Sequence, residues 1–265
     1  MTQTALVTGA SSGIGMAIAR SLGSRRFNLV LVARRKDRLQ ALAEELSSTC
    51  SVDVDVIAAD LGDRDGCDIV IKQLGSRPVD VVVNNAGAGW IGLFHEAPAE
   101  RQTEIVDVNC RAVIALTRAF LPGMIERRRG HIVQIASVAG FMPGPRSSTY
   151  YASKAFVVSH SEALRHELKG TGVAVTLVCP GPVATEFQRS SGVKGTMGGA
   201  VAMTDVDVAE ASVEAMLAGR FLVVPGAPNA LLVALSRVLP RRLSAALVDR
   251  LQKKRLAAEP AAQSN

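Results

Sequence analysis

The sequence predicts a doubly wound α/β fold, in which one seven-stranded parallel sheet has helices on both faces. Two observations point to this fold. Short apolar runs alternate along the chain with longer stretches of helical period, as in successive β-α-β units. The apolar runs are also rich in Val, Ile and Leu at every position, as expected for strands covered on both sides. We expect residues 1–228 to form this single domain and residues 229–265 to form a C-terminal extension.

Strands and helices are expected in strict alternation. The strands are expected at Ala5–Thr8, Asn28–Ala33, Val54–Ala58, Val79–Asn84, His131–Ala136, Val173–Cys179 and Phe221–Val224. The helices are expected at Gly15–Arg25, Arg35–Ser48, Asp65–Leu74, Glu100–Arg127, Tyr150–Lys169 and Asp207–Ala218. Residues Arg189–Thr204 are rich in Gly, Ser and Met and carry no pattern, and a loop of this kind inside a domain is usually a lid or a disordered segment.

The composition describes a soluble chain, because 48% of its 265 residues are hydrophobic and 20% are charged. The first residues show no basic segment followed by a long apolar run, so we expect a cytoplasmic protein without a signal or anchor there. The formal charge is +6, and residues 241–255 alone contribute +5, from six basic residues and one acidic residue. The basicity therefore belongs to a tail, and no nucleic-acid partner is expected.

The first chemical signal is a glycine-rich turn directly after the first expected strand. Gly9 permits a tight turn, Gly13 permits close passage of a pyrophosphate, and Gly15 permits the next helix to pack against the strand. Free N–H groups and the positive end of that helix can then receive phosphate. We therefore expect a dinucleotide site rather than an ordinary βα turn, with contacts from Gly9, Ser11, Ser12, Gly13, Ile14 and Gly15.

The end of the second expected strand indicates which dinucleotide binds. An NAD site usually places an acidic side chain there for the ribose 2′-hydroxyl, whereas this chain has Arg34, Arg35 and Lys36. A guanidinium can hold a 2′-phosphate through two hydrogen bonds, so we expect NADP(H), bound by Arg34 and Arg35. The alternative is that these cations are solvated residues of a helix first turn, although cations there oppose the helix dipole.

Three residues form the second signal: Ser137, Tyr150 and Lys154. Tyr150 and Lys154 are four residues apart, which places the phenol and the ammonium on one helix face. A phenol has a pKa near ~10, and a nearby cation lowers that pKa, so Tyr150 becomes a candidate general acid/base. Ser137 follows the fifth expected strand and can hydrogen-bond a substrate oxygen on which charge develops. Tyr151 is turned by about 100° around the helix and is not expected to take part.

The motifs in this order resemble the short-chain dehydrogenase/reductase family over about residues 4–225. The matching segments are T-G-A-S-S-G-I-G at 8–15, D-L at 60–61, N-N-A-G at 84–87, V-N at 108–109, Ser137, Y-Y-A-S-K at 150–154 and P-G-P-V-A-T at 180–185. The resemblance implies a Rossmann domain and an NADP(H)-dependent oxidoreductase that interconverts a carbonyl and an alcohol. A non-enzymatic nucleotide-sensing or regulatory protein on the same scaffold is the alternative.

The resemblance also implies roles for residues outside the two signals. Asn109 would hold a water in a proton relay, although an amide inside a helix can also mark a local distortion. Lys154 would bind the nicotinamide ribose as well. Further cofactor contacts are expected from Asp60, Leu61, Asn85, Ala86, Gly87, Pro180, Gly181, Val183 and Thr185. The family commonly forms dimers or tetramers through the helices at about 100–127 and 150–169, so a homodimer or homotetramer is expected.

The segment Asn229–Arg255 departs from a minimal member of the family. It begins with an apolar run of about ten residues, some ~15 Å of helix, which is too short to cross a hydrocarbon core near ~30 Å. Beyond Pro240 it continues as a basic amphipathic stretch in which Leu243, Leu247, Val248 and Leu251 are expected on one face. The segment could lie on a membrane with its cations toward anionic lipid, which favours a hydrophobic or lipid-like substrate. Alternatively, it covers a neighbouring subunit or the substrate cleft.

Two further groups of residues receive no firm role. The four histidines, His95, His131, His160 and His166, lack the spacing of metal ligands, so no metal site is expected. Trp90 and Phe94 follow the N-N-A-G segment and either line a substrate cleft or serve in ordinary packing.

Overall fold

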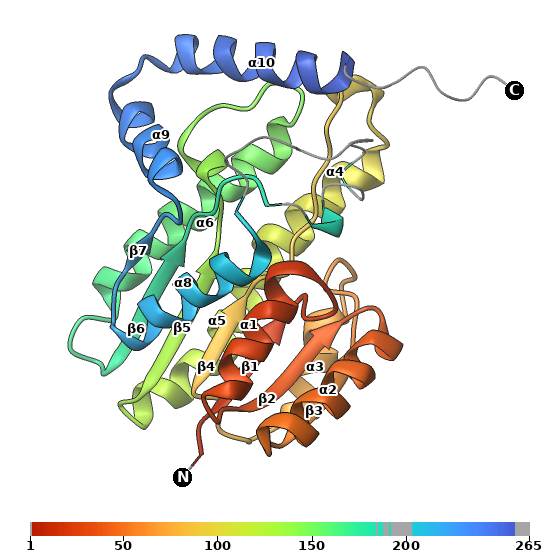
Figure 1. Cartoon of the computed structure of the whole chain (residues 1–265), viewed down its shortest axis with the longest axis vertical. Helices are drawn as coiled ribbons and strands as arrows, with labels where there is room; N and C mark the ends of the chain where they lie inside the picture. Colours follow the sequence, from red (N-terminus) through yellow and green to blue (C-terminus); the bar gives the residue numbers. More distant parts are fainter. Residues whose placement is uncertain (1, 184, 188–190, 192–202, 258–265) are drawn as a thin grey trace, which may run out of the picture.

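The computed structural model describes residues 2–183, 185–187, 191 and 203–257. Within these residues, seven parallel strands form one sheet in the order β3-β2-β1-β4-β5-β6-β7. The predicted seven-stranded parallel sheet with helices on both faces is confirmed (Figure 1). The strands are β1 Thr4–Thr8, β2 Asn28–Ala33, β3 Val54–Ala58, β4 Val81–Asn84, β5 Gly130–Ile135, β6 Val173–Val178 and β7 Leu222–Val223.

The helices follow the predicted alternation, with ends that differ by a few residues. They are α1 Gly13–Ser24, α2 Lys36–Cys50, α3 Gly66–Leu74, α4 Ala99–Val106, α5 Ala112–Glu126, α6 Ser148–Glu167, α8 Asp205–Leu217, α9 Ala227–Val238 and α10 Arg241–Ala257. The predicted loop Arg189–Thr204 lies outside the described residues, except for Ser191, Met203 and Thr204. Thr204 caps α8, because its hydroxyl accepts the Asp207 N–H at 3.1 Å.

The helix predicted over Glu100–Arg127 consists of three parts, since a π-helical turn at Asp107–Arg111 joins α4 to α5. Among the described residues, Ala99–Glu126 is the one helical stretch long and apolar enough to cross a membrane. It serves instead as a core helix, because Leu116 and Met124 are fully buried against the sheet. Its apolar character is therefore explained by packing.

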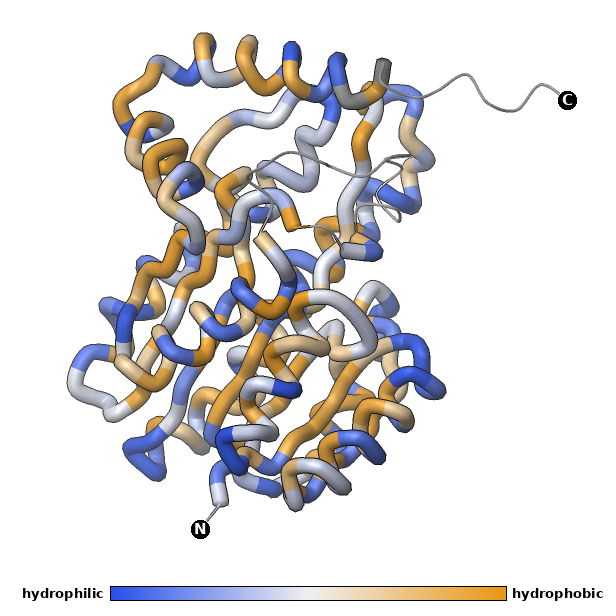
Figure 2. Tube along the Cα trace, viewed as in Figure 1, coloured by the Kyte–Doolittle hydropathy of each residue, from blue (hydrophilic) through white to orange (hydrophobic). Residues whose placement is uncertain are grey.

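Alternate residues of each central strand face opposite layers of helices. Val7 belongs to the apolar cluster that α1, α2 and α8 complete, through residues such as Ile18 and Val208. Leu6 belongs to the cluster on the other face, which α3, α5 and α6 complete. Figure 2 shows the resulting hydrophobic strands at the centre of the molecule. Burial on both faces explains why the strands read as continuous apolar runs in the sequence.

The strand order reverses between β1 and β4, which are neighbours in the sheet although β2 and β3 separate them in the chain. A crevice opens at the carboxyl ends of the strands at such a reversal. The buried Thr8 hydroxyl bridges it, because it donates to the Val83 carbonyl at 3.1 Å. It also accepts the N–H groups of Asn85 and Ala86 at 2.9 and 3.0 Å. The chain segments that follow β1 and β4 are therefore fixed relative to each other.

The C-terminal extension is continuous with the domain. The predicted boundary at residue 228 falls inside α9, whose Asn229 is buried and donates to the Pro225 carbonyl at 2.7 Å. Gly181 lies directly against this side chain, since a Cβ there would stand 2.2 Å from Asn229 Oδ1. The start of α9 is thus packed on the segment that follows β6.

The prediction that Val248 shares a face with three leucines of α10 is wrong. Val248 is only 5% exposed, whereas Leu243, Leu247 and Leu251 are 54, 51 and 56% exposed. The four-residue spacing of Ser244, Val248 and Gln252 places these buried residues on a neighbouring stripe of the helix. The leucines therefore form the outer face of α10.

Candidate active site

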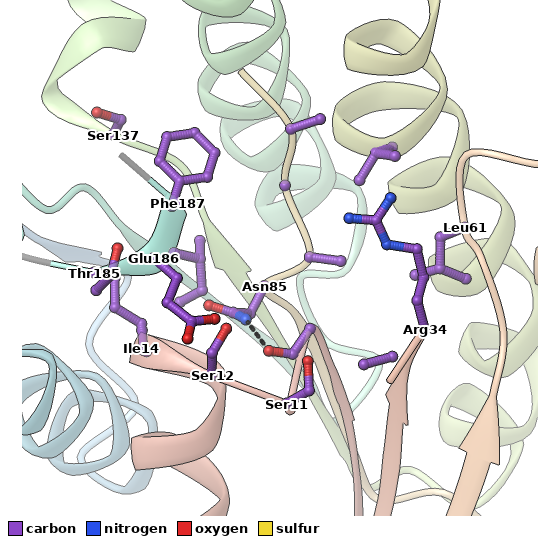
Figure 3. Close-up of a pocket in the computed structure, with 18 of the residues that line it drawn as sticks. Ser11, Ser12, Ile14, Arg34, Leu61, Asn85, Ser137, Thr185, Glu186 and Phe187 are labelled. Carbon is purple, nitrogen blue, oxygen red and sulfur yellow. Dashed lines mark hydrogen bonds between the residues drawn. The ribbon is translucent and has the colours of Figure 1, made fainter. Parts of the chain in front are cut away.

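A cleft of about 510 Å³ lies at the carboxyl ends of the central strands (Figure 3). Every predicted catalytic or cofactor residue lines it except Gly15, Asn109 and Val183, which lie behind its wall. The predicted residues that line it are Gly9, Ser11, Ser12, Gly13, Ile14, Arg34, Arg35, Asp60, Leu61, Asn85, Ala86, Gly87, Ser137, Tyr150, Lys154, Pro180, Gly181 and Thr185. The sequence-based predictions therefore converge on a single place.

The glycine turn is shaped as the sequence predicts. Gly9 and Gly13 have φ angles of +66° and +53°, in the left-handed region that side chains disfavour. A Cβ at Gly15 would lie 2.4 Å from both Gly9 O and Asn85 Nδ2, so only glycine lets α1 approach so closely. No side chain caps the first turn of α1, and none in it is acidic. The turn thus presents free N–H groups to the cleft and fits a dinucleotide phosphate.

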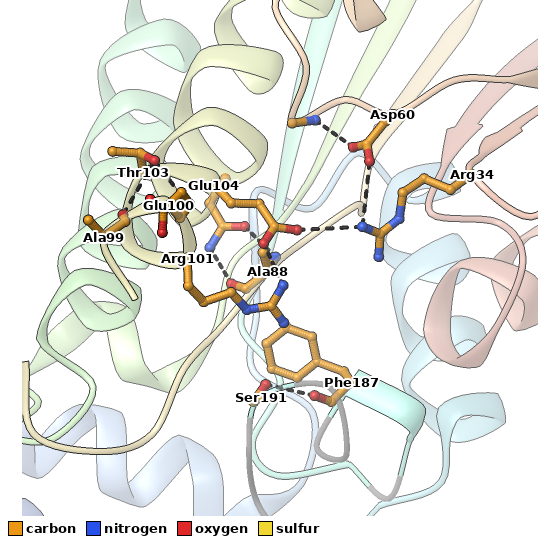
Figure 4. Close-up of polar contacts among 12 residues, drawn as sticks. Arg34, Asp60, Ala88, Ala99, Glu100, Arg101, Thr103, Glu104, Phe187 and Ser191 are labelled. Atoms are coloured by element: carbon orange, nitrogen blue, oxygen red, sulfur yellow. Dashed lines mark hydrogen bonds and ion pairs between the residues drawn. The ribbon is translucent and has the colours of Figure 1, made fainter. Parts of the chain in front are cut away.

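Both predicted arginines stand at one end of the cleft, the end expected to receive adenosine, and both form ion pairs with carboxylates. Arg34 is 62% exposed and lies 3.5 Å from both Asp60 and Glu104 (Figure 4). Arg35 donates to Glu186 at 2.7 Å and to the Ser12 hydroxyl at 2.9 Å. The residues fit a 2′-phosphate, since guanidinium and hydroxyl donors converge from β2 and the glycine turn.

Sequence reasoning missed two residues at this end of the cleft, Arg38 and Glu186, and Glu186 is an ion-pair partner of Arg35. Arg38 lies three residues further along α2 and donates to Glu186 at 2.8 Å. Its spacing from Arg35 is visible in the sequence and could have identified it as a neighbour on one helix face. Glu186 follows Thr185 in an unpatterned stretch, and nothing in the sequence indicates that it reaches across the cleft.

The second signal lies at the other end of the cleft. Ser137 follows β5, where its hydroxyl accepts the Ala139 N–H at 3.1 Å and donates to Pro180 O at 3.4 Å. Lys154 is 5% exposed and its Nζ donates to the Ile135 carbonyl at 2.9 Å. Tyr150 lines the cleft on the same helix, with its ring centroid 5.9 Å from Lys154 Nζ. Two neighbouring strands and one helix thus hold the three side chains together.

Tyr151, which is not expected to take part in catalysis, is not among the residues that line the cleft. Its ring packs on Gly144, since a Cβ at Gly144 would stand 2.0 Å from Tyr151 Cγ. Tyr150 has an aromatic neighbour that the sequence did not indicate, because the Phe187 ring lies 5.6 Å from the Tyr150 ring, centroid to centroid. Trp90 packs with the apolar cluster beside Tyr150, and Phe94 is 63% exposed.

Asn109 lies in the π-helical turn between α4 and α5 and is completely buried. Its amide accepts the Ala88 N–H at 2.8 Å and donates to the Ala88 carbonyl at 3.0 Å. It also donates to the Ser153 hydroxyl at 2.8 Å. The local distortion considered for this residue is therefore present, and the amide holds the chain after β4 against α6. Its role in a water relay stays a prediction.

Burial shifts the pKa values of both catalytic candidates on α6. It raises the pKa of Tyr150 to about 12, although a hydrogen bond with Ser137 acts in the opposite direction. It lowers the pKa of Lys154 to about 8. The expected lowering of the phenol pKa by Lys154 is therefore not found in this structure, where desolvation of the phenol is the largest effect on its pKa. At neutral pH the phenol remains protonated, as a proton donor requires.

Residues 3–194 match the family model described as short chain dehydrogenase. The chain belongs to this family. It is 42% identical over 187 residues to the NADP-dependent 3-hydroxy acid dehydrogenase YdfG of Salmonella typhi, a match that covers 69% of this chain and 73% of that protein.

Two solved structures share the fold over nearly the whole of both chains. One is a short-chain dehydrogenase from Sphingobium yanoikuyae in complex with NADPH, with a TM-score of 0.81 and 30% identity, covering 99% of this chain and 98% of that one. The other is a short-chain dehydrogenase/reductase from Burkholderia phymatum in complex with NAD, with a TM-score of 0.79 and 26% identity, covering 100% and 98%. The prediction of a nicotinamide-dependent oxidoreductase acting on CH–OH groups is thus confirmed.

The buried amine of Lys154 leads to a stability prediction for Lys154→Met. The pKa of Lys154 is about 8 in the folded chain and near ~10.4 in an unfolded one, so the folded state binds fewer protons between these values. Stability from this residue therefore rises with pH from about 8 to about 10, and at pH 7 the buried ammonium is unfavourable by about 1–3 kcal/mol. We expect Lys154→Met to lose turnover and to raise the free energy of unfolding at pH 7, less so at pH 10.

Urea unfolding of the cofactor-free variants at both pH values measures this effect. Lys169→Met is the matched control, because Lys169 follows the same helix and is exposed. It should show no pH-dependent gain. A Lys154→Met variant less stable than wild type at pH 7 would contradict the prediction.

Proposed function

We propose that this protein is an NADP(H)-dependent oxidoreductase that interconverts a carbonyl and an alcohol on a hydrophobic substrate. One observation carries the proposal: Ser137, Tyr150 and Lys154 occupy one end of a cleft whose other end holds the glycine turn and Arg34 and Arg35. A dinucleotide is long enough to connect two such ends, and the donors at each end suit the corresponding half of the molecule.

The preference for NADP(H) over NAD(H) rests on charge. β2 ends at Ala33, and the next two residues are Arg34 and Arg35 instead of an acidic residue that would bind a ribose 2′-hydroxyl. The similar Salmonella protein is NADP-dependent, and the Sphingobium structure contains NADPH. The Burkholderia structure contains NAD, so the charges of this chain carry more weight than the shared fold.

A nicotinamide bound in the cleft would supply or accept the hydride. Ser137 and Tyr150 would hold the substrate oxygen, and Tyr150 would donate its proton as a carbonyl becomes an alcohol. The raised pKa of Tyr150 keeps the phenol protonated for this step. Lys154 uses one N–H on the Ile135 carbonyl and retains two donors for a ribose hydroxyl.

Apolar groups surround the reacting end and support a hydrophobic substrate. Phe187 packs on the Tyr150 ring. Ala88 and Val108 also line the cleft and belong to the apolar cluster on which Tyr150 packs, so this part of the cleft wall is apolar. Such a wall favours an alkyl or ring substituent next to the carbonyl through burial of apolar surface.

A tyrosine pair within one helix tests the assignment of the proton donor. Tyr150→Phe removes the hydroxyl from the cleft, and we expect kcat to fall by ~10²- to 10⁴-fold. Tyr151→Phe changes the neighbouring residue, whose ring packs on Gly144, and should retain turnover. NADPH oxidation is followed at 340 nm in a standard assay over a panel of aliphatic ketones, aromatic aldehydes and 3-oxo acids. Full turnover by Tyr150→Phe would overturn the assignment.

We also propose that the α9–α10 surface rests on an anionic membrane surface. This surface consists of exposed apolar side chains of both helices: Leu231, Leu232, Leu235, Val238, Leu243, Leu247 and Leu251. Exposed cations flank it at Arg237, Arg241, Arg242, Arg250, Lys253 and Lys254. Each cation near anionic lipid contributes about 1 kcal/mol. A second copy of the same surface fits less well, since a two-fold contact would bring together two surfaces of like, positive charge.

Vesicle flotation tests the membrane proposal with full-length protein. Truncation at Asn229 would disturb the cleft, because Asn229 packs on Gly181. The test variant is therefore Leu243→Ser/Leu247→Ser/Leu251→Ser, and the control is Val206→Ser/Leu217→Ser on α8, whose side chains are 59 and 56% exposed. We expect wild type and control to float with phosphatidylserine vesicles and the triple variant to remain at the bottom. Equal partition of all three, or no flotation of wild type, would contradict the proposal.

A further inference from the structure

A carboxylate of the chain itself binds Arg35, one of the two arginines expected to receive the 2′-phosphate, together with its neighbour Arg38. Glu186 accepts Arg35 Nη1 at 2.7 Å and Arg38 Nη1 at 2.8 and 2.9 Å through its two oxygens. Figure 3 shows Glu186 among the residues that line the cleft, with its carboxylate directed toward Ser12 of the glycine turn. The partners come from opposite sides of the cleft, since Arg35 and Arg38 lie at the start of α2 and Glu186 follows β6.

The contacts of Glu186 differ from those of the other carboxylates at this end. Arg34 is 3.5 Å from both Asp60 and Glu104, a distance at the limit of a hydrogen bond. Glu186 makes short, charge-assisted contacts with two guanidinium groups at once. These contacts hold the pKa of Glu186 down to about 2, so the carboxylate is ionised throughout the neutral range. The two arginines therefore have an anionic partner before any cofactor binds.

We propose that Glu186 competes with the 2′-phosphate of NADP(H) for Arg35 and Arg38, and so sets the affinity for the phosphorylated cofactor. The inference rests on the proposed NADP(H) preference and adds a residue, Glu186, that weakens this preference. In the free chain, the two guanidinium charges face one carboxylate charge. A 2′-phosphate brings up to two negative charges and three acceptor oxygens. Its interaction with the two arginines is therefore stronger than that of the carboxylate, and it displaces Glu186.

The location of Glu186 connects this exchange to the rest of the cleft. Its neighbour Thr185 lies over the glycine turn, since a Cβ at Gly13 would stand 3.0 Å from Thr185 Cγ2. Its other neighbour, Phe187, packs on the Tyr150 ring. Displacement of Glu186 therefore takes place one residue from groups that contact the phosphate-binding turn and the proton donor.

The test compares ligands that differ only in the 2′-phosphate and lack the nicotinamide. Equilibrium dissociation constants for 2′,5′-ADP and 5′-AMP are measured by calorimetry with wild type and Glu186→Gln, so the readout does not depend on activity. Removal of one carboxylate from two partly exposed ion pairs is expected to tighten 2′,5′-ADP by about three- to tenfold. The constant for 5′-AMP should change less than the constant for 2′,5′-ADP, because this ligand lacks the 2′-phosphate that competes with Glu186 for Arg35 and Arg38.

Two further variants serve as controls. Glu45→Gln removes the same charge from an exposed pair with Arg20 on the outer side of α2, and should change neither constant. Arg38→Gln removes one partner of Glu186, so adding Glu186→Gln to it should give a smaller gain than in wild type.

The outcomes separate this inference from the proposed cofactor. One outcome is that wild type binds 2′,5′-ADP more tightly than 5′-AMP while Glu186→Gln binds 2′,5′-ADP no more tightly than wild type does. In that case the proposed competition by Glu186 is wrong and the NADP(H) preference stands. If wild type and Glu186→Gln both bind 5′-AMP as tightly as 2′,5′-ADP, the preference and the competition are both wrong. A weaker constant for 2′,5′-ADP in Glu186→Gln would show that the carboxylate supports the site and does not compete.

Discussion

The buried hydroxyl of Thr8 joins the two halves of the sheet at the point where the strand order reverses. It contacts the carbonyl of Val83 and the N–H groups that follow β4, while Asn85 donates back to the Thr8 carbonyl at 2.8 Å. The position of the glycine turn depends on these hydrogen bonds, because Gly9 and Gly15 both contact Asn85. Side chains at either position would push the turn from β4 and close the crevice. A stability requirement in the sheet therefore also shapes the phosphate-binding turn.

The two ends of the cleft differ in how far their charged and titratable side chains are exposed to water. The end proposed to bind adenosine is exposed, and its arginines pair with Asp60, Glu104 and Glu186, so their charges lie there without a large desolvation penalty. The reacting end is buried, and desolvation dominates, which keeps Tyr150 protonated and makes Lys154 easier to neutralise. Binding and proton transfer thus occupy surroundings of different polarity along one cleft.

The sequence predicted the strands well, and it identified residues that the structure brings into one cleft, because both depend on local patterns. Continuous apolar runs mark strands buried on two faces, and the glycines and the Tyr150 to Lys154 spacing identify their own geometry. The failures concern contacts between segments far apart in the chain. The contact of Glu186 with Arg35 joins residues 151 positions apart, and the burial of Val248 depends on what α10 packs against. The pKa of Tyr150 is raised, whereas the sequence predicted that it would be lowered. The spacing of Tyr150 and Lys154 reveals a neighbouring charge, but it does not reveal the loss of water around the phenol.

The C-terminal helices are built into the reacting end of the molecule. Asn229 of α9 fills the space that a side chain at Gly181 would need, and Asp249 of α10 accepts Arg146 Nε at 2.9 Å, just before α6 begins. Figure 1 shows both helices beyond the carboxyl ends of the strands. The residues that line the cleft lie at these same strand ends. The two helices pack on the segment after β6 and on the residues just before α6. A change in these contacts should therefore alter substrate binding more than adenosine binding.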